Sequence, residues 1–256
     1  MFLENFRKIL RQRQSRYPAL PSGLRIFAIG DIHGRMDLLQ SLLQDIEREI
    51  VTGPKETHNY IVFLGDYIDR GDQSAQVIDF LANFNPPWAE PIFLYGNHEQ
   101  IFETILTDGA DASTIYDWLS FGGHETMKSY GIPASVAYSD NAINIVDALK
   151  QAVPADHVRF ISNLHLKWAY GGYFFCHAGV NPHCGLDSQS AQDLIWIRDP
   201  FLKHRKDFGA IVVHGHSVSG QPQFKENRIG IDTGAWRSGV LTTLIIEGDD
   251  CRFMQT

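Results

Sequence analysis

Ile61-Val62-Phe63-Leu64-Gly65-Asp66-Tyr67-Ile68-Asp69-Arg70-Gly71 combines a short apolar run with a glycine and a cluster of charged residues. A short apolar run closed by glycine is typical of a buried strand. Four further segments also end in a small residue next to a group that can bind a metal: 26–31, 92–97, 173–177 and 211–216. Strand ends in an α/β sheet meet at one edge, where such folds bind ligands. The five segments therefore predict one shared site.

The residues around these strands predict a mainly parallel sheet with helices. Apolar stripes predict a helix over 36–51 and a second over 74–84, which stops before Pro86-Pro87. The alternation of strand and helix up to residue 97 implies an α/β fold. Residues 101–163 contain no strong strand run, so we expect a helical insertion over the site. Strand patterns return after residue 164, with Gly171-Gly172 as a hairpin turn and a final pair near 240–254.

Composition and charge exclude several classes of protein. The 256 residues suit one large domain, and 44% hydrophobic and 20% charged residues are ordinary for a soluble protein. The net charge of -8 argues against general nucleic-acid binding, so we expect no nucleic-acid partner. The 3 cysteines have no C-x-x-C spacing, which predicts neither disulfides nor a zinc knuckle and favours the cytoplasm. No apolar run approaches the ~18–20 residues of a membrane helix.

Residues 1–22 differ from the rest, and we expect them to form an N-terminal extension ahead of one domain over 23–256. The extension has helical periodicity, with its apolar and basic residues on different faces: Phe2, Leu3, Phe6, Ile9 and Leu10 against Arg7, Lys8, Arg11, Arg13 and Arg16. This pattern predicts an amphipathic basic helix. It either docks a partner or a membrane surface, or packs on its own domain with its basic residues in water.

The polar residues at the strand ends have the chemistry of a metal site. Asp31 and His33 form a D-x-H pair, and positions i and i+2 of a strand end point the same way, so both can reach one ion. Asp66 can bridge two ions through its two carboxylate oxygens. This sharing predicts two metals about 3.5–4 Å apart, an arrangement used for displacement at phosphorus.

Three further ligands complete the predicted set. Asn97 offers an amide oxygen, and His177 and His216 offer imidazole nitrogens. His214 is the alternative to His216, because it lies two residues earlier on the same face of the strand. Mixed carboxylate and imidazole ligands suit Mn, Fe, Zn or Ni better than they suit Ca or Mg. Of these metals we expect Mn, with Fe, Zn or Ni as alternatives.

Several of these residues lie in motifs that resemble a known family. Gly-Asp-Ile-His-Gly at 30–34, Gly-Asp-x-x-Asp-Arg-Gly at 65–71 and Gly-Asn-His-Glu at 96–99 resemble three signature motifs of the phosphoprotein phosphatase (PPP) family of metallophosphoesterases. His-Ala-Gly at 177–179 and Gly-His at 215–216 match later motifs. The matches keep the family order and span residues 30 to about 235.

Two segments bear on the branch of the family. Ile-Asp-Thr-Gly-Ala at 231–235 stands where eukaryotic members carry Ser-Ala-Pro-Asn-Tyr. It resembles the bacterial and phage-type serine/threonine phosphatases, which include lambda protein phosphatase, and it also resembles the bacterial diadenosine tetraphosphatases. Gly-Gly-x-x-Thr-x-x-Ser-Tyr-Gly at 122–131 is more similar to the bacterial serine/threonine phosphatases.

The resemblance implies a calcineurin-like fold: a central β-sandwich of two mixed sheets, flanked by helices, with the metals at one edge. It also implies the distribution of the ligands. Asp31, His33 and Asp66 would hold the first metal. The second metal would be held by Asp66, Asn97, His177 and His216.

The resemblance further implies direct in-line attack on phosphorus by a hydroxide that bridges the two metals, with no phosphoenzyme. Arg70 and Arg198 would clamp the phosphate oxygens, since a guanidinium fork suits that task; Arg237 is the alternative to Arg198. His98 would be the general acid for the leaving alkoxide, with Asp69 orienting its ring.

The predicted function is hydrolysis of phosphoserine and phosphothreonine by a monomeric phosphomonoesterase whose substrate is a phosphoprotein or phosphopeptide. One alternative is the hydrolysis of diadenosine tetraphosphate, another dinucleoside polyphosphate or another small phosphoester on the same core. Another alternative is an inactive, phosphatase-like binding module. The complete set of ligands, together with His98 and Asp69, argues against that alternative because a scaffold has no need of an acid.

Overall fold

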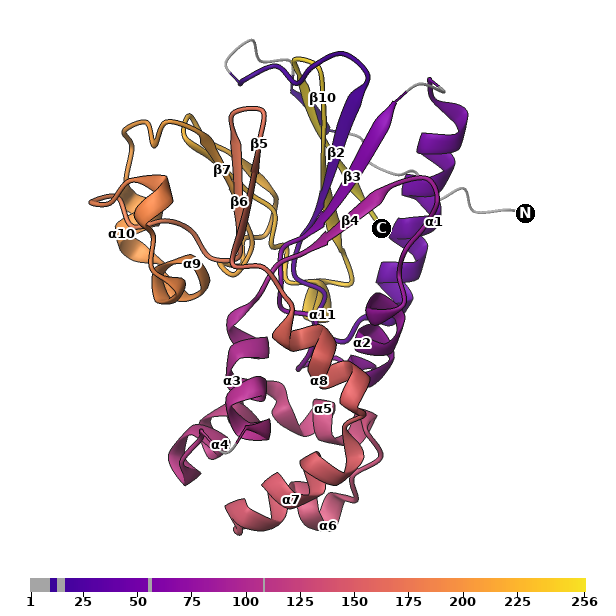
Figure 1. Ribbon diagram of the computed structural model, residues 1–256, viewed down its shortest axis with the longest axis vertical. Helices are drawn as coiled ribbons and strands as arrows, with labels where there is room; N and C mark the ends of the chain where they lie inside the picture. Colours follow the sequence, from indigo (N-terminus) through magenta and orange to yellow (C-terminus); the bar gives the residue numbers. More distant parts are fainter. Residues whose placement is uncertain (1–9, 13–16, 55–56, 108) are drawn as a thin grey trace.

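The computed structural model describes residues 10–12, 17–54, 57–107 and 109–256, and it contains two β-sheets packed face to face (Figure 1). The first sheet has, in spatial order, β1 (Leu10–Gln12), β11 (Asp250–Gln255), β10 (Thr242–Glu247), β2 (Leu24–Ile29), β3 (His58–Phe63) and β4 (Glu90–Phe93). The second has β5 (Lys167–Tyr170), β6 (Tyr173–Cys176), β7 (Ile211–His214), β9 (Arg228–Gly230) and β8 (Gln223–Phe224).

Both sheets are mixed. Strands β2, β3 and β4 run parallel, as do β6, β7 and β9, while the other neighbours are antiparallel. The predicted sandwich of two mixed sheets is therefore confirmed.

The apolar runs of the central strands are buried on both faces. In β2, Ile26 and Ala28 belong to the core between the sheets, whereas Phe27 and Ile29 belong to the core beneath the helices. Because neither face meets water, the strand is apolar throughout instead of alternating with polar residues. All five apolar runs that sequence analysis singled out contribute strands.

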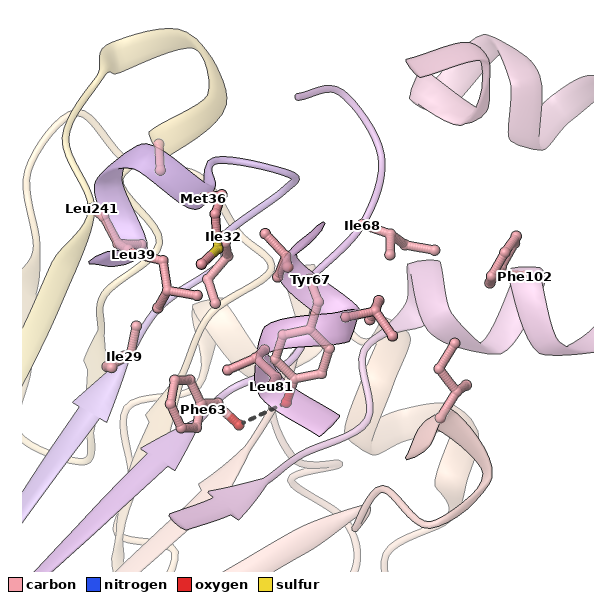
Figure 2. Close-up of a cluster of buried hydrophobic side chains, with 14 of the residues drawn as sticks. Ile29, Ile32, Met36, Leu39, Phe63, Tyr67, Ile68, Leu81, Phe102 and Leu241 are labelled. Atoms are coloured by element: carbon pink, nitrogen blue, oxygen red, sulfur yellow. Dashed lines mark hydrogen bonds between the residues drawn. The ribbon is translucent and has the colours of Figure 1, made fainter. Parts of the chain in front are cut away.

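Helices cover the outer faces of the sandwich (Figure 1). Helices α1 (Met36–Thr52) and α2 (Ser74–Ala82) cover the first sheet, and α9 (Ala191–Trp196) and α10 (Asp199–Lys203) cover the second. Figure 2 shows part of the core between the first sheet and its helices, with these side chains in one cluster: Ile29, Met36, Leu39, Phe63 and Leu81. Tyr67 lies in the same cluster, with its hydroxyl 3.4 Å from the Phe63 carbonyl (Figure 2). The hydroxyl is closer to the Leu94 carbonyl, at 2.7 Å.

The described residues between β4 and β5 form helices and no regular strand. The elements are α3 (Asn97–Leu106), α4 (Ala112–Trp118), a π-helical turn η1 (Leu119–Gly123), α5 (His124–Ser129), α6 (Ala134–Ala137), α7 (Ala142–Ala152) and α8 (Ala155–Ser162). These helices lie together at the end of the sandwich toward which the carboxyl ends of β2, β3 and β4 point (Figure 1). Two short helices lie later in the chain, η2 (Leu186–Ser188) and α11 (Ala235–Ser238).

The structure corrects one prediction near the N-terminus. Leu10–Gln12 form β1, paired antiparallel with β11, so the predicted helix is wrong at these residues. The open edge of β11 offers backbone hydrogen bonds that a local helical pattern cannot take into account. The rest of that predicted helix, at 1–9 and 13–16, lies outside the described residues. No helix within the described part of the chain is long and apolar enough to cross a membrane.

Candidate metal centre and active site

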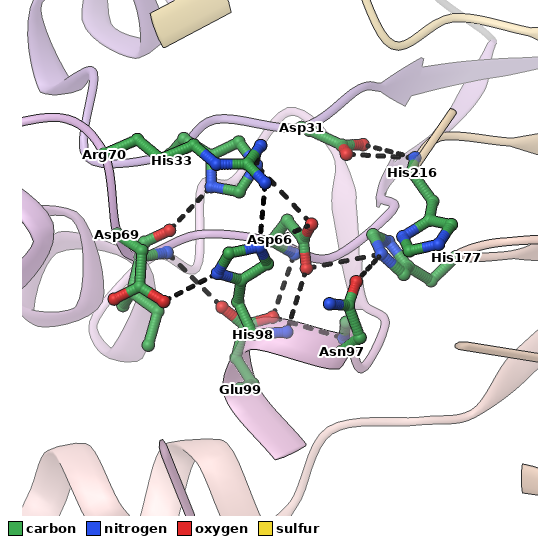
Figure 3. A network of polar contacts seen from close by, with 12 residues as sticks. Asp31, His33, Asp66, Asp69, Arg70, Asn97, His98, Glu99, His177 and His216 are labelled. Atoms are coloured by element: carbon green, nitrogen blue, oxygen red, sulfur yellow. Dashed lines mark hydrogen bonds and ion pairs between the residues drawn. The ribbon is translucent and has the colours of Figure 1, made fainter. Parts of the chain in front are cut away.

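The loops after five strands converge at one edge of the sandwich (Figure 3). Each carries one of the predicted ligands directly after its strand or a few residues later: Asp31, Asp66, Asn97, His177 and His216. All five side chains are buried. Because a buried polar group needs a partner, such a gathering of acids and imidazoles requires strong mutual interactions or a bound ion.

The loops are tight. Five non-glycine residues of the site have positive φ angles: His33 (46°), Asp66 (52°), Asp69 (71°), Arg70 (69°) and His216 (59°). Non-glycine residues rarely adopt this region, and strained backbone of this kind clusters at functional sites. The loops also pack closely on each other: a Cβ on Gly215 would lie 2.0 Å from Asp31 Oδ1. The glycines beside the ligands are therefore needed for space.

Asp66 lies at the centre of the cluster. Its Oδ2 is 3.5 Å from His33 Nε2 and 3.9 Å from His98 Nε2, and its Oδ1 is 3.3 Å from His177 Nε2. Two groups of potential ligand atoms result, each within 4.8 Å: His33, Asp66 and His98, and then Asp66, His177 and His216. The carboxylate of Asp66 is common to both groups, so it lies where one carboxylate could contact two ions.

The imidazoles are oriented with Nε2 toward this centre. His33 Nδ1 is 2.7 Å from the Ile68 carbonyl and His177 Nδ1 is 2.8 Å from the Leu64 carbonyl. Since a carbonyl only accepts, each Nδ1 carries the proton, and this fixes the ring orientation as in known metal sites. His216 Nε2 is buried and has no hydrogen-bond partner among the described residues. A cation at this point would satisfy that nitrogen.

The electrostatics of the cluster also fit cations. Burial, helped by His98, lowers the pKa of His33 well below its ordinary value. Burial and the nearby His177 lower the pKa of His216 to about 2, so both rings are neutral at neutral pH, the form that binds a metal. At His177, burial lowers the pKa, but Asp66 outweighs it and raises the pKa above its ordinary value. A positive charge is thus favoured beside Asp66.

Asp31 and Asn97 occupy the two sides of the cluster. The Asp31 carboxylate accepts hydrogen bonds from the His216 backbone N–H at 2.9 and 3.2 Å, which ties the β2 loop to the β7 loop. Burial and the charges of Asp232 and Asp66 raise the pKa of Asp31 well above its ordinary value, and cations would relieve this repulsion. Asn97 Oδ1 lies 3.0 Å from His177 Nε2. Asp31 belongs to neither of the two groups of ligand atoms. The group with His33 and Asp66, in which Asp31 was predicted, contains His98 instead.

Of the two alternatives on β7, His216 faces the cluster and His214 does not. His214 is buried against the ring of Phe201, with 4.9 Å between ring centroids, and burial lowers its pKa to about 4. The strand ends at His214, and His216 takes a positive φ. The two residues therefore do not share the same face, as they would on a regular strand.

Beside the cluster, His98 and Asp69 form a second feature. His98 Nδ1 donates to Asp69 Oδ2 at 2.6 Å, which leaves Nε2 pointing toward Arg70 Nη2 at 3.2 Å. Burial lowers the pKa of His98, but Asp66 and Asp69 outweigh burial and raise the pKa above its ordinary value. An imidazole that keeps its proton here is suited to act as a general acid.

An open pocket of about 680 Å³ adjoins this pair and the cluster. Arg70, Arg198 and Arg237 line it, together with Trp236 and others. Arg70 Nη1 lies 2.7 Å from His33 Nε2, and Arg198 Nη1 donates to the His216 carbonyl at 3.2 Å. The guanidinium groups thus lie between the cluster and solvent, where an incoming anion would meet them.

Residues 24–235 match the sequence model of a family described as calcineurin-like phosphoesterase. The chain belongs to this family. Its members use a dinuclear metal centre, so the two groups of ligand atoms that share Asp66 have the composition expected of the family. The resemblance stated from the motifs is confirmed, and the protein is a phosphoester hydrolase by family.

The similar proteins fall into two kinds. Bis(5'-nucleosyl)-tetraphosphatase PrpE [asymmetrical] of Anoxybacillus flavithermus is 24% identical over 238 residues, 84% of this chain and 88% of the relative. Serine/threonine-protein phosphatase 2 of Escherichia coli is 29% identical over 225 residues, 85% of this chain and 90% of the relative. A crystal structure provisionally assigned as a diadenosine tetraphosphatase has a TM-score of 0.59 at 17% identity, over 93% of this chain and 98% of the other. This last likeness supports the fold.

The metallophosphoesterase site contains residues to which sequence analysis gave no role. Glu99 is fully buried, and its carboxylate accepts hydrogen bonds from the backbone N–H groups of Asp66 (2.9 Å) and Tyr67 (2.8 Å). It thereby holds the loop that carries Asp66. Glu99 lies three residues after the N-cap Gly96 and accepts from its N–H at 3.2 Å, which is one half of a capping box and a local pattern that could have indicated such a role. Thr126, which contacts Asp69, lies in the motif at 122–131 but was given no role, and Trp118, which also contacts Asp69, had no comparable signal.

Proposed function

We propose that the protein is a metal-dependent phosphomonoesterase that hydrolyses phosphoserine and phosphothreonine in proteins. The pair of His98 and Asp69, 2.6 Å apart beside Arg70, carries the proposal. Release of phosphate from serine expels an alkoxide, a poor leaving group that must be protonated as it departs. Cleavage of a phosphoanhydride expels a phosphate, which leaves more readily and has less need of an acid.

We assign the metal ligands as the motifs imply. One ion would be held by Asp31, His33 and Asp66, and the other by Asp66, Asn97, His177 and His216. Two divalent ions, for which we propose Mn²⁺, would supply an activated water for direct attack on phosphorus. The inward nitrogens and the unpartnered His216 Nε2 support this assignment.

The remaining residues bind the substrate and move a proton. Arg70 and Arg198 are placed to hold phosphate oxygens, since both line the pocket next to the cluster. His98 Nδ1 donates a hydrogen bond to the Asp69 carboxylate, so Nε2 is the atom that would protonate the leaving oxygen. The ligand side chains are buried, and the low dielectric around them strengthens these charge interactions.

A second candidate function is the hydrolysis of dinucleoside polyphosphates. The pocket has more cationic and aromatic side chains than binding of a single phosphate requires. Arg237 lines it in addition to Arg70 and Arg198. Phe121 and Trp236 also line it and expose 54% and 37% of their surface. A chain of phosphates would meet several cations there, and a base could contact an aromatic ring. The similarity to PrpE proteins also favours this candidate.

Substrate preference separates the two candidates. The Mn²⁺-loaded protein should hydrolyse a phosphothreonine peptide with a higher kcat/KM than diadenosine tetraphosphate. A preference for the nucleotide would overturn the proposal and support the second candidate. An absence of activity on both substrates and on p-nitrophenyl phosphate would support an inactive binding module.

A further inference from the structure

We propose that the end of α4 and the π-helical turn after it position the Asp69–Arg70 pair for catalysis, with Trp118 as the principal positioning residue. This inference rests on the proposed function, because it assumes that His98 is the general acid. The proposal gives a role to Gly122–Thr126, which the sequence analysis noted only because this segment resembles bacterial serine/threonine phosphatases.

The first observation is the way in which Asp69 is held. Trp118 Nε1 donates to both carboxylate oxygens, at 3.1 Å to Oδ1 and 3.0 Å to Oδ2. Thr126 Oγ1 donates to Oδ1 at 2.6 Å, while His98 Nδ1 donates to Oδ2 at 2.6 Å. Asp69 and Trp118 are both fully buried. In such surroundings the donors fix the plane of the carboxylate, and the carboxylate in turn fixes the His98 ring.

The second observation concerns the backbone of the same pair. Asp69 and Arg70 have φ angles of 71° and 69°, a strained conformation for residues other than glycine, so the surroundings must hold both residues in place. Two contacts from the insertion do so. The Arg70 N–H donates to the Gly122 carbonyl at 3.1 Å, and the Asp69 N–H donates to Thr126 Oγ1 at 2.9 Å.

The third observation is how closely the insertion packs on Arg70. A Cβ on Gly122 would lie 2.5 Å from Arg70 N and 2.7 Å from Arg70 Cγ, and Gly122 itself has a φ of 110°. Only glycine allows the π-helical turn to approach in this way. The Trp118 ring packs directly on Gly123, where a Cβ would lie only 2.5 Å from the ring. The turn thus joins the indole and the Arg70 backbone in one packed unit.

Trp118 makes two separable contributions, the N–H that it directs at the buried carboxylate and the packing of its ring. The indole ring also packs against Phe102, with 5.8 Å between ring centroids, and phenylalanine could keep most of that packing. What phenylalanine cannot supply is the N–H group between the two Asp69 oxygens. The Trp118→Phe variant therefore separates positioning from packing.

The test compares two substrates that differ in their need for an acid. p-Nitrophenyl phosphate releases a stable phenolate, whereas a phosphoserine peptide releases an alkoxide. For the Mn²⁺-loaded Trp118→Phe protein, we expect kcat on the peptide to fall at least about 10-fold, and by no more than the ~10²–10⁴-fold that a general acid contributes. The value on p-nitrophenyl phosphate should change little, because the indole N–H contacts Asp69 alone, while the Gly122 carbonyl holds the Arg70 backbone in the variant as well. In a His98→Asn background, Trp118→Phe should have no additional effect on the peptide.

Two other variants keep the test decisive if Trp118→Phe folds poorly. Thr126→Val removes the donor to Asp69 Oδ1, while the Asp69 N–H keeps Ser74 Oγ as an acceptor at 3.0 Å. It should show the same selective loss on the peptide. Phe102→Leu is the matched control, because it loosens the packing around Trp118 without removing a polar contact, and it should affect both substrates equally.

The outcomes distinguish the two proposals. If His98→Asn is selective for the peptide but Trp118→Phe and Thr126→Val are not, the positioning role is refuted and the proposed function stands. Equal losses from Trp118→Phe in the wild-type and His98→Asn backgrounds would also refute positioning. If His98→Asn itself lowers turnover of both substrates equally, the general-acid assignment fails, and the role of Trp118 fails with it.

Discussion

Replacement of Gly215 by alanine should disable the metal site while the fold survives. The new Cβ would lie 2.0 Å from Asp31 Oδ1, about 1.4 Å short of ordinary contact at 3.4 Å. Asp31 cannot simply rotate away, because it is buried and its carboxylate accepts from the His216 N–H at 2.9 Å. Either the carboxylate or the loop that carries His216 must therefore shift by roughly the missing distance.

The expected size of the effect follows from that shift. A misplacement of about 1 Å at an active site can cost ~10²-fold in rate, so we expect a loss of this order in kcat with p-nitrophenyl phosphate. Overpacking of this kind costs about 1–3 kcal/mol of stability, which lowers Tm by roughly 2–12 °C in a protein of this size. The variant should accordingly remain folded at 25 °C, with weaker affinity for Mn²⁺.

The assay combines titration calorimetry with Mn²⁺, turnover with saturating Mn²⁺ and thermal unfolding by circular dichroism. Gly220→Ala is the matched control, because a Cβ on Gly220 has no atom within 4 Å and should change none of the three measurements. If Gly215→Ala keeps Mn²⁺ affinity and turnover within about threefold of the wild type, the site does not need the geometry described, and the reasoning is refuted.

Three further predictions concern the ligands and their supports. Glu99→Gln should lower the free energy of unfolding by about 2–6 kcal/mol in chemical denaturation. Both carboxylate oxygens of Glu99 accept from buried backbone N–H groups, so an NH₂ group in place of either oxygen leaves such donors without an acceptor. Substitution of an exposed residue, Glu47→Gln, is the control and should cost under ~0.5 kcal/mol. His216→Ala should remove about one of two bound Mn²⁺ per chain in elemental analysis, whereas His214→Ala should keep both; the reverse result would reassign the ligand. Chelation should lower Tm and Mn²⁺ should restore it, since binding at ~100 times Kd adds about 2.7 kcal/mol; a Tm independent of Mn²⁺ would contradict a metal bound by Asp31 and Asp66.

The elements that depend on the pattern of neighbouring residues were predictable from the sequence. Apolar runs closed by glycine gave the central strands, and the helices predicted over 36–51 and 74–84 are found at Met36–Thr52 and Ser74–Ala82. Helix α2 ends two residues early because the chain turns at Asn83 toward the prolines. Strand β1 was missed because its pairing depends on the edge of β11, more than 200 residues away in the sequence.

The sequence by itself determined which groups follow each strand, and hence the acids and imidazoles of the cluster, because the ends of neighbouring strands must meet. Only the tertiary structure decided how those groups are used. His216, and not His214, faces the cluster because of a positive φ after β7. The hydrogen bond from Trp118 to Asp69 joins residues 49 positions apart. Such contacts depend on how the insertion packs against the sheet edge, and no local pattern of residues specifies that packing.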